Sequence, residues 1–293
     1  MLKGIKKLDV AHRVYEICLS AVTLISPILN TKLYYRISHG KKLDLKNPKG
    51  FNEKILWLKL NNYMNNPTII QCADKYAVRR YIKDKGYGIN LVNLLAVYKS
   101  VDEIDWNSLP GKFAMKLNYG CGFNIICTDY SQFNRQDAIT KLNRWMKSQY
   151  YLSHSEMQYK HVERKIIVEE FIETRSGEFP ADYKFYCFNG EPKCLLFCSE
   201  REEGHTLKTL FDLEGNILNY RDDTVKQNFP NPICFNEMLE LCRGLADGFP
   251  FVRVDLYDRD GKVVFGELTF TPAGGTGHYN SDGDRILGEL IRI

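Results

Sequence analysis

The sequence lacks an apolar run that is long enough to cross a bilayer. A membrane-spanning helix needs roughly 18–20 apolar residues. The longest uncharged stretch, residues 17–31, also contains Ser, Thr, Asn and Pro27, and it predicts a buried or surface-packed helix. It is a poor signal peptide as well, because Asp9 and Glu16 precede it and no small-x-small cleavage site follows. We therefore expect a cytoplasmic chain that does not span a membrane.

Several common active-site motifs are also missing. The chain contains neither G-x-x-x-x-G-K-[ST] nor G-x-G-x-x-G, which argues against the P-loop and the dinucleotide-binding fingerprint. No Ser-His-Asp or Cys-His signature stands out, and His154, His161, His205 and His278 are scattered. The sequence thus gives no sign of a side-chain nucleophile.

The cysteine pattern is not that of a disulfide framework or a zinc site. The nine cysteines are odd in number and unevenly spaced. Cys194 and Cys198 form C-x3-C, but no second Cys/His pair at zinc-like spacing accompanies them. This favours a reduced, cytosolic chain in which most cysteines are small core residues.

Positive charge is concentrated near the N-terminus. Residues 1–60 hold twelve Lys/Arg and four Asp/Glu, a net charge of +8, and since the whole chain is +4 the remainder is −4. A basic region beside an apolar helix can contact an anionic lipid surface or an anionic polymer. A solvated basic helix face explains the pattern equally well. We expect no nucleic-acid partner, because no binding module or aromatic–basic repeat is present.

The most informative segment that is present is Phe251–Gly275. Asp255 and Glu267 each lie within an apolar run, and a charged turn at residues 258–261 separates them. A hairpin of this kind brings the two carboxylates to neighbouring strands, with Arg253 on the same face as Asp255. A buried carboxylate needs a partner, and near phosphates that partner is usually Mg²⁺. The segment therefore predicts a metal–phosphate site.

Apolar periodicity predicts an α+β fold with no internal repeat. We expect residues 1–50 to be helical and then irregular. Further helices are predicted over residues 51–60, 67–86, 136–150 and 235–245. Strands are predicted over residues 92–98, 113–117, 124–128, 165–172, 182–188, 194–199 and 206–212, with a tight turn at Asn189-Gly190 and the hairpin at 251–275.

A lysine and a glycine-bearing loop form a second candidate site. Lys116 ends a predicted strand just before Gly120, Cys121 and Gly122. A lysine there can hold a phosphate as a point charge, and the glycines allow backbone N–H groups to approach phosphate oxygens. A plain hairpin turn is an equally good explanation.

The remaining candidates are weaker. Glu169 and Glu170 are consecutive on a strand, so one of them can point inward, and Phe171 and Ile172 could form part of an adenine slot. The alternative is a strand end with two solvated acids.

Four further charged residues complete the set of candidates. Asp182 and Lys184 share a strand face and could bind a ribose and a phosphate, or pair with each other. Arg201 follows the predicted strand at 194–199 and could contact a phosphate or substrate, or be a solvated loop charge. Lys75, taken alone, is typical of a surface lysine.

Taken in order, these segments resemble the ATP-grasp superfamily, and most closely its TupA-like family of bacterial surface-polysaccharide clusters. The similar segments, between residues 51 and 277, are FNEKILWLKL, ADKYAVRRYI, FAMKLNYGCG, IIVEEFI, DYKFYCFNGEP and VRVDLYDRDGKVVFGELTFTPAGG. The resemblance implies two α+β lobes that grip ATP. We expect a helical extension at 1–50, an N-terminal lobe at 51–112, a central lobe at 113–175 and a C-terminal lobe with the metal site at 176–293.

The resemblance also implies ATP and Mg²⁺ as cofactors. The candidate ATP-binding residues are Lys75, Lys116, Gly120, Cys121, Gly122, Glu169, Glu170, Phe171, Ile172, Asp182, Lys184 and Arg201. Arg253 and Lys116 are the candidate catalytic residues, and Asp255, Glu267 and Thr269 the candidate metal ligands. Many ATP-grasp enzymes have Asn in place of Thr269, whose hydroxyl is a weaker Mg²⁺ ligand than an amide carbonyl.

The activity that the resemblance implies is carboxylate–amine ligation through an acyl-phosphate. The substrates would be an amino acid and a sugar carboxylate such as a uronic acid, joined in capsule, O-antigen or teichuronopeptide synthesis. One alternative is a glycosyltransferase, for which Asp258-Arg259-Asp260 supplies an Asp-x-Asp string. Another is a non-catalytic or phosphotransfer relative that keeps the nucleotide fold. The basic residues 1–60 would place the protein at the inner face of the membrane.

Overall fold

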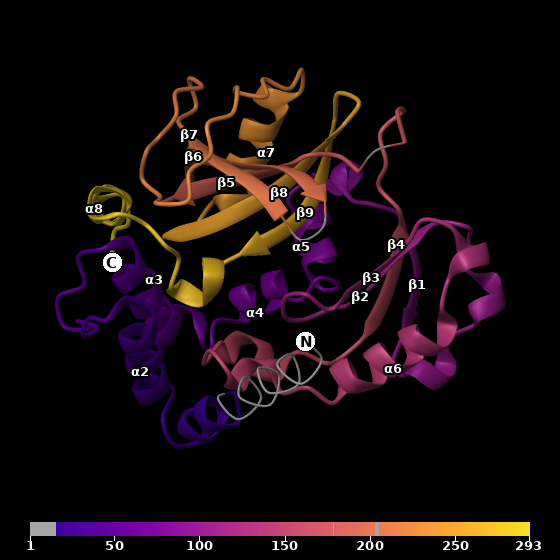
Figure 1. Cartoon of the computed structure of the whole chain (residues 1–293), viewed down its shortest axis with the longest axis horizontal. Helices are drawn as coiled ribbons and strands as arrows, with labels where there is room; N and C mark the ends of the chain where they lie inside the picture. The colour runs from indigo at the N-terminus through magenta and orange to yellow at the C-terminus, as the bar shows by residue number, and fades with distance from the viewer. Residues whose placement is uncertain (1–15, 178, 203–204) are drawn as a thin grey trace, which may run out of the picture.

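Two antiparallel sheets lie at the centre of the protein (Figure 1). A computed structural model describes residues 16–177, 179–202 and 205–293, without the side chains of residues 199–202 and 205–206. The five-stranded sheet lies at the top of Figure 1 and the four-stranded sheet at the right, and helices fill the lower left. The predicted α+β class is confirmed.

The four-stranded sheet has the order β1-β4-β2-β3. Its strands are β1 (Leu94–Tyr98), β2 (Phe113–Leu117), β3 (Asn124–Cys127) and β4 (Ile166–Glu170). The predicted hairpin of β2 and β3 is confirmed, with Lys116 opposite Asn124. Met115 and Val168 on one face of the sheet share a hydrophobic core with Leu142 of α6 (Arg135–Met146).

The five-stranded sheet has the order β7-β6-β5-β8-β9. Its strands are β5 (Asp182–Phe188), β6 (Glu191–Glu202), β7 (His205–Phe211), β8 (Phe251–Arg259) and β9 (Lys262–Thr269). The amphipathic helix α7 (Phe235–Ala246) buries Met238, Leu241 and Leu245 in the same core as Phe185 and Val254. The β8–β9 hairpin pairs Asp255 directly with Glu267, as predicted.

The remaining helices surround one end of this sheet. Residues 16–25 are helical, and the other helices are α2 (Pro27–His39), α3 (Phe51–Leu58), α4 (Pro67–Ala73), α5 (Val78–Asp84) and α8 (Ser281–Glu289). Shorter helical turns are η1 (Lys59–Tyr63), η2 (Gly88–Asn90), η3 (Val101–Glu103), η4 (Trp106–Ser108), η5 (Tyr130–Gln132), η6 (Tyr150–Leu152), η7 (Met157–His161) and η8 (Pro272–Gly275). Residues 51–82 share a core with residues 183–291, whereas residues 101–168 enclose a second core. The four-part division of the chain stays a prediction.

The single helix predicted over residues 67–86 is wrong. The chain forms α4 and α5 with a break between them, because Asp74 ends α4 in an extended conformation. Its carboxylate then accepts hydrogen bonds from the backbone N–H groups of Tyr76 and Ala77, a competition that Asp side chains offer to helical pairing. Lys75 therefore lies in the link between two helices.

Smaller corrections concern where elements end. The helix predicted over residues 51–60 ends at Leu58 and continues as the π-helical turn η1. Strand β8 runs through Arg259, so the turn is confined to Asp260 and Gly261, which have φ of 54° and 82°. The tight turn at Asn189-Gly190 is confirmed, with positive φ at both residues.

All nine cysteines are free thiols, and seven of them are buried, which confirms their predicted role as core residues. No helix of the described residues has both the length and the apolar character needed to cross a membrane.

Candidate functional site

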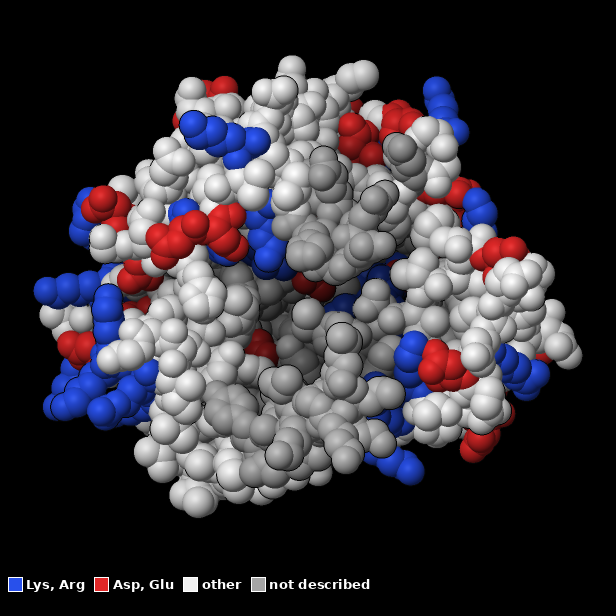
Figure 2. All heavy atoms as spheres, in the orientation of Figure 1, with Lys and Arg blue, Asp and Glu red and all other residues white. Residues whose placement is uncertain are grey.

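A cavity of about 570 Å³ lies between the two sheets. Figure 2 shows a hollow in the middle of this face, with acidic and basic side chains around its depth. Its apolar lining includes Ala114 and Ile126 from the four-stranded sheet, Phe171 from the segment after β4, and Tyr257 and Phe265 from β8 and β9. A cavity lined by both apolar and charged side chains fits a molecule with an aromatic part and an anionic part.

The two consecutive acids of β4 point to different partners, as the strand alternation predicts. Glu169 is buried and its carboxylate lies 2.5 Å from Lys116 Nζ and 3.1 Å from an Arg79 guanidinium nitrogen. Glu170 instead lies 2.8 Å from Arg259. Both acids, with Phe171 and Ile172, line the cavity.

The glycine loop closes one side of the cavity. Gly120 and Gly122 have φ of 71° and 76°, a backbone conformation that favours glycine. A Cβ on Gly120 would lie 2.9 Å from the Tyr150 ring, whereas one on Gly122 would meet nothing within 4 Å. Although Cys121 is exposed, desolvation by the surrounding residues and the charge of Glu267 raise the pKa of its thiol, so this residue is not an activated nucleophile.

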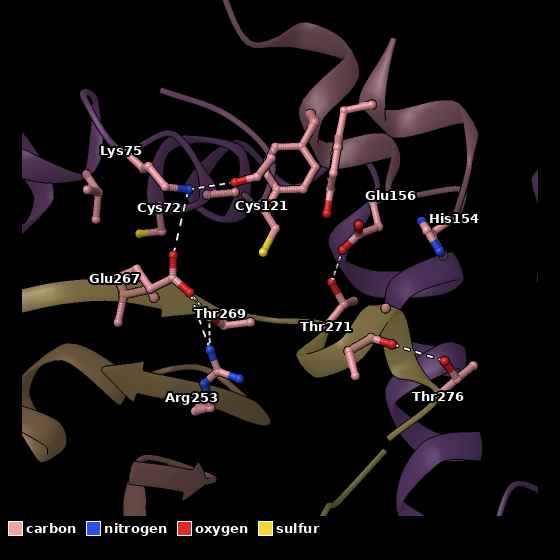
Figure 3. A pocket seen from close by; sticks show the side chains of 18 of the residues that line it. Cys72, Lys75, Cys121, His154, Glu156, Arg253, Glu267, Thr269, Thr271 and Thr276 are labelled. Atoms are coloured by element: carbon pink, nitrogen blue, oxygen red, sulfur yellow. Dashed lines mark hydrogen bonds and ion pairs between the residues drawn. The ribbon is translucent and has the colours of Figure 1, made fainter. Parts of the chain in front are cut away.

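The break between α4 and α5 directs Lys75 at the glycine loop. The Lys75 backbone N–H donates to the Asn118 carbonyl at 2.7 Å, and its Nζ donates to the Gly120 carbonyl at 2.7 Å. Nζ also lies 3.7 Å from a Glu267 carboxylate oxygen. Lys75 thus connects the loop to the β8–β9 hairpin (Figure 3).

A buried network of opposite charges surrounds Asp255. Arg253 contacts both carboxylate oxygens of Asp255, at 2.6 and 2.7 Å. Lys184 Nζ lies 2.7 Å from Asp255 and 2.6 Å from Asp182. Burial disfavours the charge of Lys184, but the two acids outweigh it and raise its pKa. Asp182 and Lys184 therefore pair with each other at the edge of the cavity.

Glu267 lies where the charged groups converge. One of its oxygens accepts from Thr269 Oγ1 at 2.9 Å and lies 3.3 Å from an Arg253 nitrogen. Burial raises its pKa, but the charges of Lys75, Arg253 and Lys184 together outweigh burial and lower the pKa to about 2. Glu267 is therefore a carboxylate at any physiological pH.

The donor atoms at this position suit Mg²⁺. No group of three or more His, Cys, Asp or Glu that could hold a metal occurs within the described residues. Mg²⁺ commonly binds one or two carboxylates together with substrate phosphates and water. Asp255 and Glu267 provide two carboxylates from directly paired positions, and Thr269 adds a hydroxyl. This pair fits a metal that a nucleotide brings with it better than a preformed protein cage.

The structure brings nearly all the predicted site residues to the cavity. The exceptions are Arg253 and Thr269, which line an adjoining cavity. The side chain of Arg201 lies outside the description. Both acids of the Asp-x-Asp string already accept backbone hydrogen bonds. Asp258 accepts from Gly261 N within the turn, and Asp260 accepts from Arg175 N.

Sequence reasoning missed Arg79, which is bound to Glu169 and to the Val92 carbonyl. Nothing in the sequence marked it, because the break between α4 and α5 removes the helical spacing that would relate it to Lys75. It also missed the adjoining cavity, whose acid, Glu156, lies in a segment of short turns with no regular period.

The chain resembles solved structures at low identity. A D-alanine–D-alanine ligase from Bacillus anthracis in complex with ATP is 11% identical, with a TM-score of 0.40, over 76% of this chain and 57% of that one. An L-amino acid ligase from Bacillus licheniformis is 12% identical, with a TM-score of 0.44, over 74% and 47%. The ATP-grasp ligase PsnB with its minimal precursor is 12% identical, with a TM-score of 0.42, over 81% and 67%. This chain therefore spans about half to two thirds of the length of these structures.

None of the curated proteins matches the chain. The sequence model of the TupA-like ATPgrasp family, by contrast, matches residues 53–292. That match covers most of the chain, including both sheets and every candidate site residue. The protein belongs to the TupA-like ATP-grasp family and has the ATP-grasp fold.

Proposed function

We propose that this protein is an ATP-dependent ligase that joins an amino acid to a sugar carboxylate, such as a uronic acid, in bacterial surface-polysaccharide synthesis. The observation that carries the proposal is the position of Glu267. This carboxylate lines both the cavity of about 570 Å³ and the adjoining cavity of about 460 Å³, and Lys75 and Arg253 lie beside it. A reaction between ATP and a second substrate needs such a junction.

The chemistry assigned to the site is carboxylate activation. A carboxylate oxygen of the sugar attacks the γ-phosphorus of ATP, and ADP leaves. The amine nitrogen then attacks the carbonyl carbon of the acyl-phosphate, phosphate leaves with the electron pair of the C–O bond, and the amine loses a proton. The first step brings two anions together and the second expels phosphate, so the protein's main contribution is positioning and charge compensation.

Different residues would contact different parts of ATP. Ala114, Ile126, Phe171 and Ile172 would hold the adenine ring, and Lys116 and the glycine loop the phosphates. Asp182 would contact the ribose. These roles would use both the apolar and the cationic side chains that line the cavity.

Charge compensation would come from the hairpin. Arg253 and Lys75 would stabilise charge on the transferring phosphoryl group. Asp255, Glu267 and Thr269 would hold Mg²⁺, which when bound neutralises phosphate charge.

The proposal is tested by the dependence of phosphate release on its substrates. We expect the full-length protein to release phosphate and ADP from ATP only when a uronic acid and an amino acid are both present. Single-substrate reactions are the controls.

A glycosyltransferase predicts a different ligand. ATP–Mg²⁺ should raise the melting temperature of the protein, and a UDP-sugar without a carboxylate, such as UDP-glucose, should not; the reverse result would favour glycosyl transfer. The turn contacts of Asp258 and Asp260 already leave the Asp-x-Asp string poorly placed for a metal.

We further propose that the N-terminal helices hold the enzyme against an anionic lipid surface. Helix α2 exposes apolar side chains and buries polar ones, which is the reverse of an ordinary surface helix. Its exposed side includes the apolar residues Ile28, Leu29, Leu33 and Ile37, whereas Asn30 is buried. An apolar helix face turned to solvent is typical of an interaction surface.

Local contacts explain the inversion. The Asn30 side chain donates to the carbonyl of Ser153 and to Ser155 Oγ, both at 3.1 Å. Thr23, from the preceding helix, also bonds to Ser155 Oγ at 2.9 Å. These bonds fix the polar side of the helices inward, so the apolar side faces out.

Basic residues lie next to this apolar face. Residues 32–49 contain six exposed Lys/Arg, and their only acid is Asp44. Figure 2 shows Lys and Arg gathered at the lower left, on the side where α2 lies in Figure 1. Apolar anchors beside cationic groups fit an anionic bilayer better than a soluble anionic polymer, which would leave the apolar residues in water.

Vesicle co-sedimentation tests this surface. We expect the full chain to bind vesicles of phosphatidylserine and phosphatidylcholine more tightly than phosphatidylcholine alone. The double variant Leu29→Glu/Leu33→Glu should abolish binding, and Lys41→Gln should weaken it about fivefold, since one lysine near the surface contributes about 1 kcal/mol. Ile89→Glu, at an apolar residue that is more exposed than Leu29 and Leu33 but lies outside this surface, is the control. Binding that survives the double variant, or that occurs only with a soluble polyanion, would contradict the proposal.

A further inference from the structure

The adjoining cavity contains a buried acid that the proposed ATP site does not use. The two cavities share Lys75, Gly120, Cys121, Gly266 and Glu267 in their linings. From this junction the second cavity extends to a polar end built from the segment around Glu156 and from the chain after β9. Figure 3 shows Lys75, Glu267 and Arg253 on one side of this cavity and Glu156, Thr271 and His154 on the other.

Glu156 is held in place without a cation next to it. Its side chain is 4% exposed, and one carboxylate oxygen accepts a hydrogen bond from Thr271 Oγ1. No described Lys, Arg or His side chain forms an ion pair with it. A buried carboxylate without a paired cation is costly, so its place in a cavity wall points to a cationic or proton-donating ligand.

The Tyr150 side chain is also hydrogen-bonded to Glu156, and Lys59 and Lys75 act on it by charge, but neither lysine forms a direct ion pair with it. Lys59, in the π-helical turn η1, is 1% exposed, and its Nζ donates to the His154 carbonyl at 2.8 Å. It therefore fixes the segment before Glu156. Burial lowers the pKa of Lys59 to about 8. Burial, helped by Lys59, lowers the pKa of His154 to about 4, so this imidazole is neutral.

The pKa of Glu156 is raised, which makes its carboxylate a stronger base. Burial raises the pKa of Glu156, although Thr271, Lys59, Tyr150 and Lys75 all act in the opposite direction. Tyr159, which also lines the cavity, stays protonated because burial raises its pKa well above the usual value. A carboxylate of raised pKa is a better proton acceptor than an exposed one.

We propose that Glu156 binds the primary amine of the amino-acid substrate and accepts its proton when the amide bond forms. In this step the C–N bond forms, the C–O bond to phosphate breaks with its electron pair on the leaving phosphate, and the proton passes from nitrogen to a Glu156 oxygen. The assignment rests on the proposed ligase function. The sugar carboxylate would then be activated on the ATP side of the junction, and the amine would bind on the Glu156 side.

Hydroxylamine separates the amine step from the ATP step. It is largely uncharged at neutral pH and attacks acyl-phosphates without a base, giving a hydroxamate. The wild type and Glu156→Gln are compared with ATP–Mg²⁺ and a panel of glucuronic and galacturonic acids and their UDP forms. The nucleophile is either hydroxylamine or an equimolar mixture of the twenty L-amino acids, and products are measured by mass spectrometry.

We expect Glu156→Gln to form hydroxamate within about twofold of the wild-type rate and amide at least about 100-fold more slowly, the usual scale of a general base. Glu156→Asp keeps the carboxylate and should show a smaller loss confined to the amide. Glu163→Gln, at an exposed acid of the following segment, should leave both products unchanged. Melting curves establish that each variant is folded.

Three outcomes would overturn the assignment. Equal losses of hydroxamate and amide in Glu156→Gln would mean that the residue acts in ATP chemistry or in folding alone. No loss of either product would mean that it has no role in the reaction. Absence of hydroxamate and ADP from the wild type would instead reject the ligase function on which the assignment rests.

Discussion

Replacement of Glu267 by glutamine is expected to reduce ATP turnover at least about 100-fold and to leave the fold intact. The amide has the same shape and can still accept the hydrogen bond from Thr269 Oγ1. It carries no charge, however, so it can neither hold Mg²⁺ well nor balance Lys75 and Arg253. Removing one charge-stabilising group from a preorganised site typically costs this much.

Phosphate release and a melting curve, measured on the same preparation, test this expectation. Glu191→Gln is the matched control, because Glu191 makes a surface ion pair with Arg243 at 3.1 Å, and such pairs contribute about 0–1 kcal/mol. Turnover of Glu267→Gln at the wild-type rate would show that Glu267 is not at the reaction centre.

Lys116→Ala is expected to have an effect of similar size for a different reason. Lys116 Nζ contributes a positive charge at the cavity, 2.5 Å from Glu169, and loss of this charge weakens the hold on the phosphates. Glu169 keeps Arg79 as its partner at 3.1 Å, so the variant leaves no buried acid unpaired. We therefore expect ATP affinity and turnover to fall together while the melting temperature changes little.

Lys112→Ala provides the control on the same side of the sheet. Lys112 pairs with Glu173 at 2.5 Å, and its side chain is 49% exposed. Isothermal titration with ATP–Mg²⁺ and phosphate release should distinguish the two variants clearly. Equal behaviour of Lys116→Ala and Lys112→Ala would remove Lys116 from the proposed site.

The parts of the site that could be predicted are those formed by local pairing. The β8–β9 hairpin is such a case, because alternating side chains and a short turn place Asp255, Glu267 and Arg253 together without any distant contact. The turn at Asn189-Gly190 follows from the same local rules.

The parts that escaped prediction depend on contacts between distant segments. The direction of Lys75 is set by its backbone bond to Asn118, and the break that frees it arises from one Asp side chain. The burial of Lys59 depends on the His154 carbonyl, 95 residues away in the chain. The inverted side of α2 depends on polar groups near Ser155. No periodicity in the sequence reports such contacts.

The measurement that tests the central claim most directly is the substrate dependence of ATP cleavage. The full-length protein is given ATP–Mg²⁺ with the panel of uronic acids, with the mixture of amino acids, and with both, and released phosphate, ADP and amide are measured together. The account predicts equal amounts of phosphate, ADP and amide, and only when both substrates are present. Phosphate release that needs neither substrate, or transfer of a sugar without ATP cleavage, would contradict it.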